Sequence, residues 1–377
     1  MAFTGLAVIS IGGPLALAAL IVPGLVADAS ASAGLVVVAG VVVFAAPLVI
    51  WFRYAQHIQS GGGLYAFTEE AAGRRVALVQ AGLWLVSYLL YLVYTTAQIV
   101  YQVLPEVLPG VSPFQPFLEI AIPAALAGVM IAGRSTALIV TGVLAAGQLA
   151  IAAALGGVTV ARLGAPLTSF GASAPAGAFP GAIGQTSLLY ICASLPLFLG
   201  GEVTRPAITM RRGMIAAYLV TGVVVTAAVF PLAAAPAFTR ADIPGVSVAQ
   251  QFAGRGFAVA VGVGVAASIA GVILAEYFAV GRLVHAVTSR SMRSINIALG
   301  GIMVVAAPLT LLGPVRIYDD LVRPSLVALW LSQLIVFAVY PRFAARNGHG
   351  KFSTWSLTVV AIAFTLYGLW TSAFQLT

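Results

Sequence analysis

Charged side chains are scarce in this chain. Its 377 residues include 18 Lys and Arg and 10 Asp and Glu, so that 7% of the chain is charged, whereas a soluble domain carries about 25%. A folded chain of this length could not cover its surface in water with so few charges. The composition therefore excludes a soluble enzyme, a nucleic-acid-binding protein and a disordered chain, although the formal net charge is +8.

Cysteine is almost absent as well. The single thiol, Cys192, excludes an intramolecular disulfide and a metal site built from several cysteines. His57, His285 and His349 all fall at segment edges, and no two have metal-ligand spacing. The chain also lacks Gly-x-Ser-x-Gly, His-Glu-x-x-His and paired intramembrane aspartates. We therefore expect neither an enzyme nor a bound cofactor or metal. The N-terminus lacks a basic stretch before its long apolar run, so we expect no removable signal peptide.

Long apolar segments are what the sequence has instead. Apolar residues make up 61% of the chain, and a membrane-spanning helix needs about 20 consecutive apolar residues. We predict an all-α integral membrane protein with about eleven transmembrane helices. The expected segments are 4–27, 34–52, 76–101, 117–132, 135–160, 184–201, 214–234, 256–284, 294–313, 320–340 and 353–374.

The distribution of Lys and Arg predicts the orientation in the membrane. With a cytoplasmic N-terminus, 13 of the 18 basic residues fall in cytoplasmic loops and 5 in outer loops. Cytoplasmic loops carry such an excess in most membrane proteins. We therefore expect a multi-pass protein of the cell membrane with a cytoplasmic N-terminus, whose basic loops face anionic lipid.

Two segments carry sequences that interrupt a helix. Gly12, Gly13 and Pro14 lie inside the first segment, one turn after Ser10, and Pro196 lies near the middle of the sixth. Each segment opens one half of the chain, and matching interrupted helices in two halves mark the binding site of many transporters. A simple proline kink is the alternative. We take the candidate substrate-binding residues from these breaks: Ser10, Gly12, Gly13, Tyr190, Cys192, Ala193 and Ser194.

Several motifs resemble those of the amino acid–polyamine–organocation (APC) superfamily of transporters. After segment six, the run GEVTRPAITMRRGMIAA is similar to a family pattern of Glu-Val, Pro and a basic residue, carried here by Glu202, Val203, Pro206 and Arg211. After segment two, SGGGLYAFTEEAAGRRVALVQAGLW is similar to the family run of Gly-Gly-x-Tyr, Gly-Arg and Gly-x-x-Trp. GRLVHAVTSR at the end of segment eight and IVPGL in segment one add to the resemblance.

The resemblance implies an inverted repeat of five plus five helices, with substrate held at discontinuous helices one and six. We divide the chain into a first repeat (1–163), an external connecting loop (164–183), a second repeat (184–341) and a final loop with the eleventh helix (342–377). Members of the family move amino acids, polyamines or related small molecules by proton or sodium coupling or by exchange.

Segment three presents a polar and aromatic face. Trp84, Tyr88, Tyr91, Thr95, Gln98 and Gln102 follow one another at steps of four and three residues, which places them on one side of a helix. Such a face avoids lipid and either packs as a hydrogen-bonded seam or lines the transport path. We assign Tyr88 and Tyr91, at mid-depth, to the substrate path.

Glu276 is the candidate proton-coupling residue. It lies within segment eight, and an ionisable group in a spanning helix is either functional or part of a structural pair. Its pairing alternatives are Arg282, His285 or a tyrosine hydroxyl. Glu119, at the start of segment four, is expected to be interfacial. Weaker candidates at intermediate depth are Gln148, Ser187, Ser268, Trp330 and Gln333.

These observations favour a permease that moves amino acids or related small organic solutes by alternating access, coupled to protons or working by exchange. The partners expected are the solute, a proton and the lipid bilayer, with no nucleic acid. One alternative is a transporter of an inorganic cation such as potassium on the same fold. Another is a membrane subunit that does not transport. Neither the individual substrate nor the oligomeric state follows from the residues.

Overall fold

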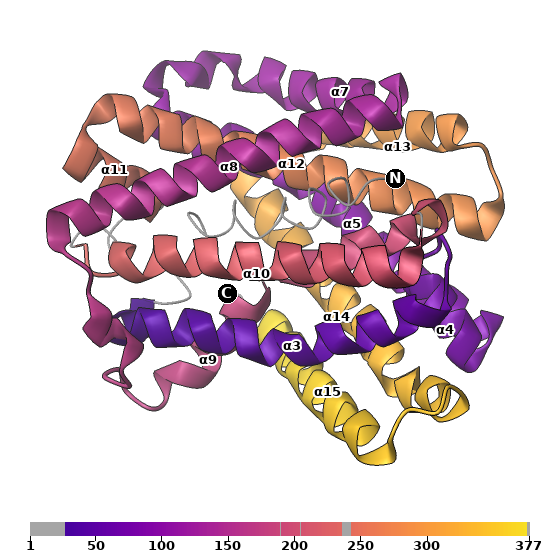
Figure 1. The fold of residues 1–377 in the computed structure, drawn as a ribbon. Coiled ribbons are helices and arrows are strands. Elements are labelled where there is room, and N and C mark those ends of the chain that lie inside the picture. Colours follow the sequence, from indigo (N-terminus) through magenta and orange to yellow (C-terminus); the bar gives the residue numbers. More distant parts are fainter. Residues whose placement is uncertain (1–26, 189, 204, 236–242, 375–377) are drawn as a thin grey trace.

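The computed structural model describes residues 27–188, 190–203, 205–235 and 243–374, and within these ranges the chain is helical (Figure 1). Nine helices in the described ranges are long and apolar enough to cross a membrane. The principal long helices are α3 (Ala33–His57), α5 (Arg74–Ala97), α7 (Gln115–Ala132), α8 (Arg134–Leu163), α10 (Pro206–Leu232), α12 (Arg255–Thr288), α13 (Met292–Ala306), α14 (Pro314–Arg346) and α15 (Lys351–Phe374).

Short elements connect or extend these helices. Four are α-helical: α4 (Leu64–Ala72), α6 (Leu104–Val107), α9 (Ala178–Leu188) and α11 (Pro244–Ala253). Five are 3₁₀ helices: η1 (Ala27–Ser32), η3 (Pro109–Phe114), η4 (Leu167–Phe170), η5 (Ile191–Glu202) and η6 (Ala307–Leu312). The π-helix η2 (Gln98–Val103) continues α5.

The expected segments two to five and seven to eleven each coincide with a helix, whereas the sixth is interrupted. Segment one, including Ser10, Gly12 and Gly13, lies outside the described residues. The expected loop before segment seven is wrong in part, because α10 already begins at Pro206. A proline suits the first position of a helix, since its missing N–H would have no partner there.

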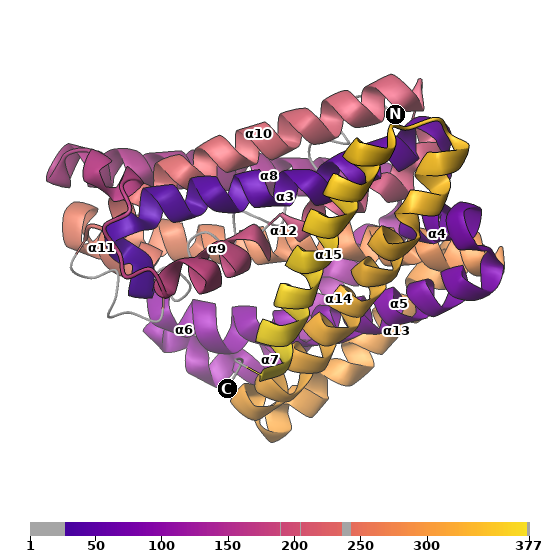
Figure 2. The ribbon, with the colours of Figure 1, turned by 90° about the horizontal axis from the view of Figure 1, so that it is seen from below.

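Helices at equivalent positions of the two halves pack against each other. α3 contacts α10, α5 contacts α12, and α7 contacts α13. The pairs α3 with α10 and α7 with α13 run side by side in Figure 1. This pairing fits an inverted repeat, in which a pseudo-two-fold axis relates the halves. In Figure 2, α14 and α15 run next to one another, and both contact α3.

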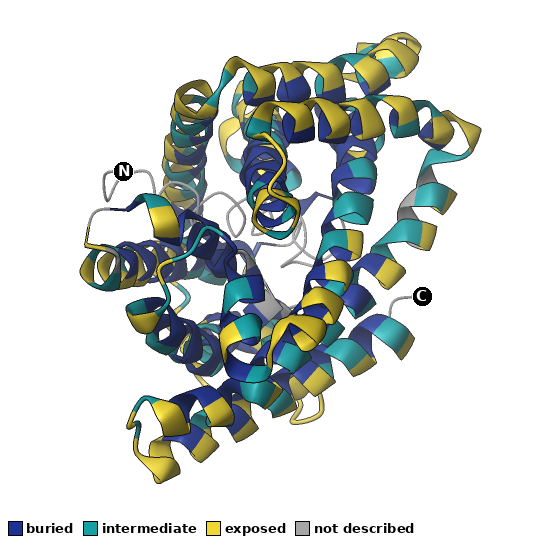
Figure 3. Ribbon diagram, turned by 90° about the vertical axis from the view of Figure 1, so that its right-hand side faces the viewer, coloured by how far each residue is buried: buried dark blue, intermediate teal, exposed yellow. Residues whose placement is uncertain are grey.

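The outward faces of the bundle are apolar. Figure 3 shows buried residues toward the interior and exposed residues on the outer faces of the helices. Ile139 and Val143, one turn apart on α8, are both 66% exposed. Apolar side chains on an exposed helix face suit contact with lipid chains rather than water. The fold is therefore that of a multi-pass membrane protein.

A glycine makes the hairpin between α7 and α8 tight. Gly133 alone separates Ala132 from Arg134, and its φ of +118° lies in a region that other residues avoid. The short connection places Arg134 at the end of the bundle where α7 ends and α8 begins. We call this the arginine-rich end, because Arg282, near the end of α12, lies there too.

Candidate functional site

The sixth spanning helix is broken in two. The α-helix α9 ends at Leu188, and the second half, η5, is a 3₁₀ helix that begins at Ile191. Ser194 is buried at the start of this half, and its hydroxyl donates to the carbonyl of Ile191 at 2.9 Å. The predicted interruption is thus confirmed.

The other candidate residues at the break, Cys192 and Ala193, lie in the first turn of η5. Ala193 is buried with Ser194 in the first turn of η5. Cys192 lies between Ile191 and Ala193, and only its backbone position is described. Proline at position 196 removes one donor from the same short helix.

An aromatic stack joins α5 to the second half of the broken helix. The ring centroids of Trp84 and Phe198 lie 4.7 Å apart, and those of Trp84 and Tyr88 lie 4.1 Å apart. Tyr91 continues the stack, with its ring 6.3 Å from Tyr88. Offset aromatic pairs at such distances contribute about 0.5–1.5 kcal/mol beyond their burial. The structure therefore places Tyr88 in a buried aromatic stack that reaches η5 through Trp84, while Tyr91 lies next to Tyr88 and is half-buried.

Tyr190 belongs to a different cluster. Its ring packs 5.2 Å from that of Tyr218 on α10 and 6.0 Å from that of Phe44 on α3. Its hydroxyl is buried and has no hydrogen-bond partner. Tyr190 therefore packs toward α3 and α10, whereas the ring of Tyr88 packs against Trp84 and Tyr91.

The face predicted on segment three does not stay regular to its end. Thr95 and Gln98 are buried, but Gln102 is exposed. The π-helical turns of η2 explain the difference, because a π-helix places more residues in each turn than an α-helix does. The expected one-sided spacing therefore drifts between Gln98 and Gln102, and the assignment of Gln102 to the inward face is wrong.

Glu276 lies deep in α12. Its residue is 1% exposed, and α12 as a whole packs against α5, α8, α11 and α13. Two of its expected partners are engaged elsewhere, since Arg282 pairs with Glu202 and Nδ1 of His285 lies 2.6 Å from the carbonyl of Arg290. The adjacent Tyr277 directs its hydroxyl to the backbone carbonyl of Asn296. A change in the protonation state of Glu276 would therefore act on the packing of α12 rather than on solvent.

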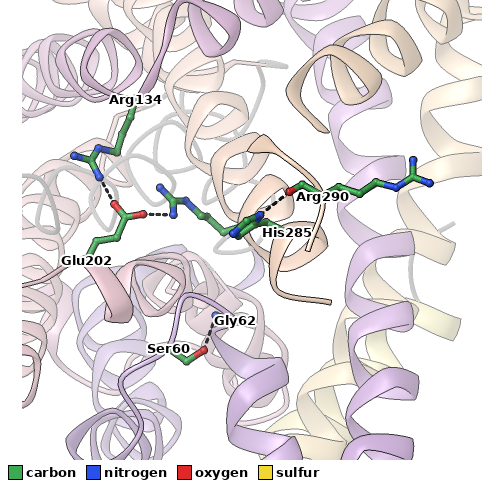
Figure 4. Close-up of polar contacts among 7 residues, drawn as sticks. Ser60, Gly62, Arg134, Glu202, His285 and Arg290 are labelled. Carbon is green, nitrogen blue, oxygen red and sulfur yellow. Dashed lines mark hydrogen bonds and ion pairs between the residues drawn. The ribbon is translucent and has the colours of Figure 1, made fainter. Parts of the chain in front are cut away.

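Glu202 ties the broken helix to the arginine-rich end. Its carboxylate forms ion pairs with Arg134 and with Arg282, and Figure 4 shows it beside Arg134. Arg282 also stacks over the Phe278 ring, with its guanidinium carbon 5.1 Å from the ring centroid. One carboxylate at the last residue of η5 thus links three segments that are far apart in sequence.

Close backbone packing accompanies this ion-pair cluster. A Cβ atom added to Gly200 would lie 2.8 Å from the carbonyl oxygen of Ser60, in the loop between α3 and α4. The loop itself is held by the Ser60 side chain, which accepts from the amide of Gly62 at 3.0 Å (Figure 4). Gly63 has a φ of +51°, and an added Cβ there would lie 2.6 Å from Phe198. The glycines of the SGGG run therefore allow η5 to close against this loop.

Several buried polar groups were missed or misplaced by sequence reasoning. Glu119 was expected at the interface, but it is 0% exposed and lies against Thr310. Gln80 is 1% exposed, and neither of its amide atoms has a hydrogen-bond partner. Gln80 lies four residues before Trp84, so the same helical spacing could have found it. Phe198 had no such signal, because its role depends on the 3₁₀ geometry of η5.

The weaker candidates are mostly buried in helix contacts. The indole of Trp330 donates to Ser372 at 3.1 Å, and the hydroxyl of Ser187 lies 3.1 Å from the carbonyl of Gly40. Gln148, Ser268 and Gln333 are buried, and their side-chain polar atoms have no hydrogen-bond partner. In the described part of the chain, no group of three or more His, Cys, Asp or Glu side chains could hold a metal ion.

The comparisons with known proteins show the fold. No protein-family model matches the sequence, and no curated protein matches it either. The structure is similar to that of MhsT in complex with L-phenylalanine, with a TM-score of 0.70, 14% identity and coverage of 98% of each chain. It is also similar to a Na⁺-coupled sialic acid symporter in a substrate-bound outward-open state. That match has a TM-score of 0.57 and 12% identity, and covers 99% of this chain and 90% of the symporter. The chain thus has a fold found in secondary transporters.

Proposed function

We propose that this protein is a secondary active transporter of small organic solutes, amino acids or closely related molecules, working by alternating access. The observation that carries the proposal is the interrupted sixth helix, whose second half packs against the aromatic face of α5. A break in a spanning helix exposes backbone donors and acceptors, which suit the charged ends of an amino acid. The neighbours described as binding L-phenylalanine and as a sialic acid symporter support this solute class.

We place the chain in the APC superfamily on its motifs. Glu202 of the GEVTRP run holds Arg134 and Arg282, and Gly63 of the SGGGLY run takes the backbone geometry that lets Phe198 approach. Each of the two motifs thus contains a residue with a structural role, an ion pair in one and a tight backbone approach in the other. The same proposal includes a division into two repeats, at 1–163 and 184–341. It also includes a cytoplasmic N-terminus, which puts the arginine-rich end in the cytoplasm.

Glu276 is the proposed proton-coupling residue. Glu276 is 1% exposed, and burial in a medium of low dielectric constant costs a charged carboxylate more than a neutral carboxylic acid. Binding and release of that proton would alter how α12 packs against α5, α8 and α13.

Uptake into proteoliposomes tests the function. Radiolabelled amino acids should accumulate in vesicles that contain the purified protein, and an inward proton gradient should accelerate accumulation. A sodium gradient forms a parallel arm, because one neighbour is Na⁺-coupled. Accumulation of a potassium analogue without any organic solute would favour the inorganic-cation alternative. The absence of all accumulation and exchange would contradict transport.

A pair of tyrosine variants tests the placement of the site. Tyr88→Ala removes a ring from the stack beside η5, and we expect uptake to fall at least about tenfold if that ring contacts substrate, since about 1.4 kcal/mol corresponds to a factor of ten. Tyr190→Phe is the matched control, because it removes a hydroxyl without a partner in the α3–α10 cluster. Normal uptake in the Tyr88 variant and loss in the Tyr190 variant would move the site to that cluster.

A further inference from the structure

The second buried glutamate lies away from the broken helix. Glu119 is on α7, fifteen positions before Arg134 of the arginine-rich end, which is about 22 Å along a helix at 1.5 Å per residue. It therefore lies toward the opposite end of the bundle. Its residue is 0% exposed, and Oε2 of its carboxyl has no hydrogen-bond partner. The proposed transport function makes no use of it.

The hydrogen-bond geometry around Glu119 is unusual. Oγ1 of Thr310, on η6, lies 2.6 Å from Oε1 of Glu119 and also 2.6 Å from the carbonyl oxygen of Ala307. A threonine hydroxyl has a single proton, so it can donate to only one of these two oxygens. If Glu119 is a carboxylate, one of the two close oxygen pairs has no proton between its members.

One additional proton on Glu119 satisfies both contacts. The carboxylic acid then donates from Oε1 to Oγ1 of Thr310, and the Thr310 hydroxyl donates to the carbonyl of Ala307. Both distances lie within the range for O–H···O hydrogen bonds. The last carbonyls of a helix often accept from a hydroxyl three or four residues later, so the bond to Ala307 is the ordinary one for Thr310.

The surroundings of Glu119 also disfavour a negative charge. The hydroxyl of Tyr101, on η2, is close enough to interact electrostatically with the carboxyl, but it is buried without a hydrogen-bond partner. A buried carboxylate is a strong acceptor and would be expected to attract a donor of this kind. The unused phenol therefore fits a neutral acid better than a carboxylate.

No described cation faces Glu119 from the elements packed on α7, which are α5, α8, α12, α13, η2, η3 and η6. η3 and η6 carry no charged residue. Glu276 is the residue before Tyr277 on α12, and the Tyr277 hydroxyl lies near Gly300 of α13. Gly300 in turn lies against Ala127, which is eight positions after Glu119, or about 12 Å along α7. The remaining charged groups lie toward the arginine-rich end or are exposed: Arg74, Arg75, Arg134, Arg162, Arg255, Arg282, His285 and Arg293.

We propose that Glu119 is a second proton-binding site of this protein, in which the bound proton links α7 to η6 through Thr310. The ligand is a proton from the solution at the end of the bundle opposite the arginine-rich end. Its release would leave a carboxylate that competes with Ala307 for the Thr310 hydroxyl. The contact between α7 and η6 therefore depends on proton occupancy, independently of Glu276.

Infrared difference spectroscopy of the purified protein tests the proton directly. At neutral pH the spectrum of wild type minus Glu119→Gln should contain the C=O band of a carboxylic acid, shifted by exchange into heavy water. Glu106→Gln is the control, because Glu106 is an exposed glutamate on α6 and should contribute carboxylate bands only. The spectrum of Glu276→Gln identifies any band that comes from Glu276, the other buried acid, so that it is not assigned to Glu119. Loss of carboxylate bands from Glu119→Gln would overturn the proposal.

A second variant and a cation series keep the test decisive if Glu119→Gln does not fold. Thr310→Val removes the acceptor while preserving shape, and it should shift the acid C=O band of the otherwise unchanged protein. An unshifted band would show that the proton does not lie toward Thr310. Addition of Na⁺ or K⁺ should leave the spectrum and the thermal stability unchanged. If either ion stabilises wild type but not Thr310→Val, the carboxyl holds a metal ion and the proton assignment is wrong.

Discussion

If the protein is the transporter that we propose, the ion-pair cluster around Glu202 should hold its arginine-rich end closed. Glu202 ends η5 and pairs with Arg134 at the α7–α8 turn and with Arg282 on α12. Opening this end would require η5 to move away from both. Glu202→Gln keeps the size and polarity of the side chain but removes its charge, so it tests the electrostatic contribution alone.

The two pairs differ in how much they stabilise the closed end. The Arg134 side chain is 50% exposed, and such a pair contributes about 0.2–1 kcal/mol. The Arg282 side chain is 16% exposed, and a hydrogen bond to a charged group in partial burial contributes about 1.5–3 kcal/mol. Removing the charge should therefore shift the equilibrium by about 2–4 kcal/mol, which is roughly 30- to 700-fold toward the open state.

The accessibility of a buried cysteine measures this shift. Ser194→Cys, in a Cys192→Ala background, places one thiol at the break, where Ser194 is buried. We expect Glu202→Gln to increase the rate of labelling from the arginine-rich face by the same roughly 30- to 700-fold. Asp320→Asn is the matched control, because the Arg316–Asp320 pair is exposed and its contact is 3.6 Å. That control should leave the labelling rate unchanged.

The order of the arginine variants provides a stricter test. Arg282→Gln should increase labelling more than Arg134→Gln, since Arg282 is the less exposed partner. Equal labelling of Glu202→Gln and its parent would refute a role for the charge in closing this end. A larger effect of Arg134→Gln would refute the reasoning from burial.

Three further predictions follow from the described contacts. Glu276→Gln should preserve solute counterflow but abolish acceleration by a proton gradient, and a full proton response in the variant would reject Glu276 as the coupling residue. Gly63→Ala should lower stability by about 1–3 kcal/mol in thermal unfolding, because of its φ of +51° and the approach of Phe198, while Gly82→Ala, with open space around it, should not. Burial, and then the nearby charges of Arg53 and His57, lower the pKa of His349 below the ordinary histidine value of about 6.5. The unfolded chain therefore binds this proton more readily, so stability should fall as pH drops through about 6.5, and less so in His349→Gln; an identical pH response in both proteins would contradict the burial of this ring.

The positions of the spanning helices along the chain follow largely from the sequence. Spanning helices require long apolar runs, and such runs are visible without knowledge of the tertiary contacts. The ends are less visible, since α3 continues through Arg53 to His57, beyond its apolar core. Arg53 remains helical there because its guanidinium donates to Tyr340 and Ser353 on the neighbouring helices. A hydropathy pattern contains no information about such partners.

The candidate site was predictable only where a residue's own helix determines its direction. Tyr88 and Tyr91 follow from the spacing along α5, which fixes their face. The side on which Tyr190 packs depends on how far the chain turns between α9 and η5, and that turn is a tertiary feature. The burial of Glu119 likewise depends on η6, whose Thr310 is distant in sequence. Contacts between remote segments therefore account for most of what the sequence did not predict.

The geometry of the broken helix suggests why it can serve as a moving part. Its first half, α9, packs on α3 and α15, whereas η5 packs mainly on α10 and α12, so that α3 is the long helix that both halves contact. Long 3₁₀ helices have poorer hydrogen-bond geometry than α-helices and are uncommon, so η5 resists rearrangement less than a continuous spanning helix would. The contacts described at its far end are the Glu202 ion pairs and the approach of Gly200 to Ser60. Under the proposed function, solute binding at the break would have to outweigh these local contacts, because a ligand shifts an equilibrium only by its difference in affinity for the two states.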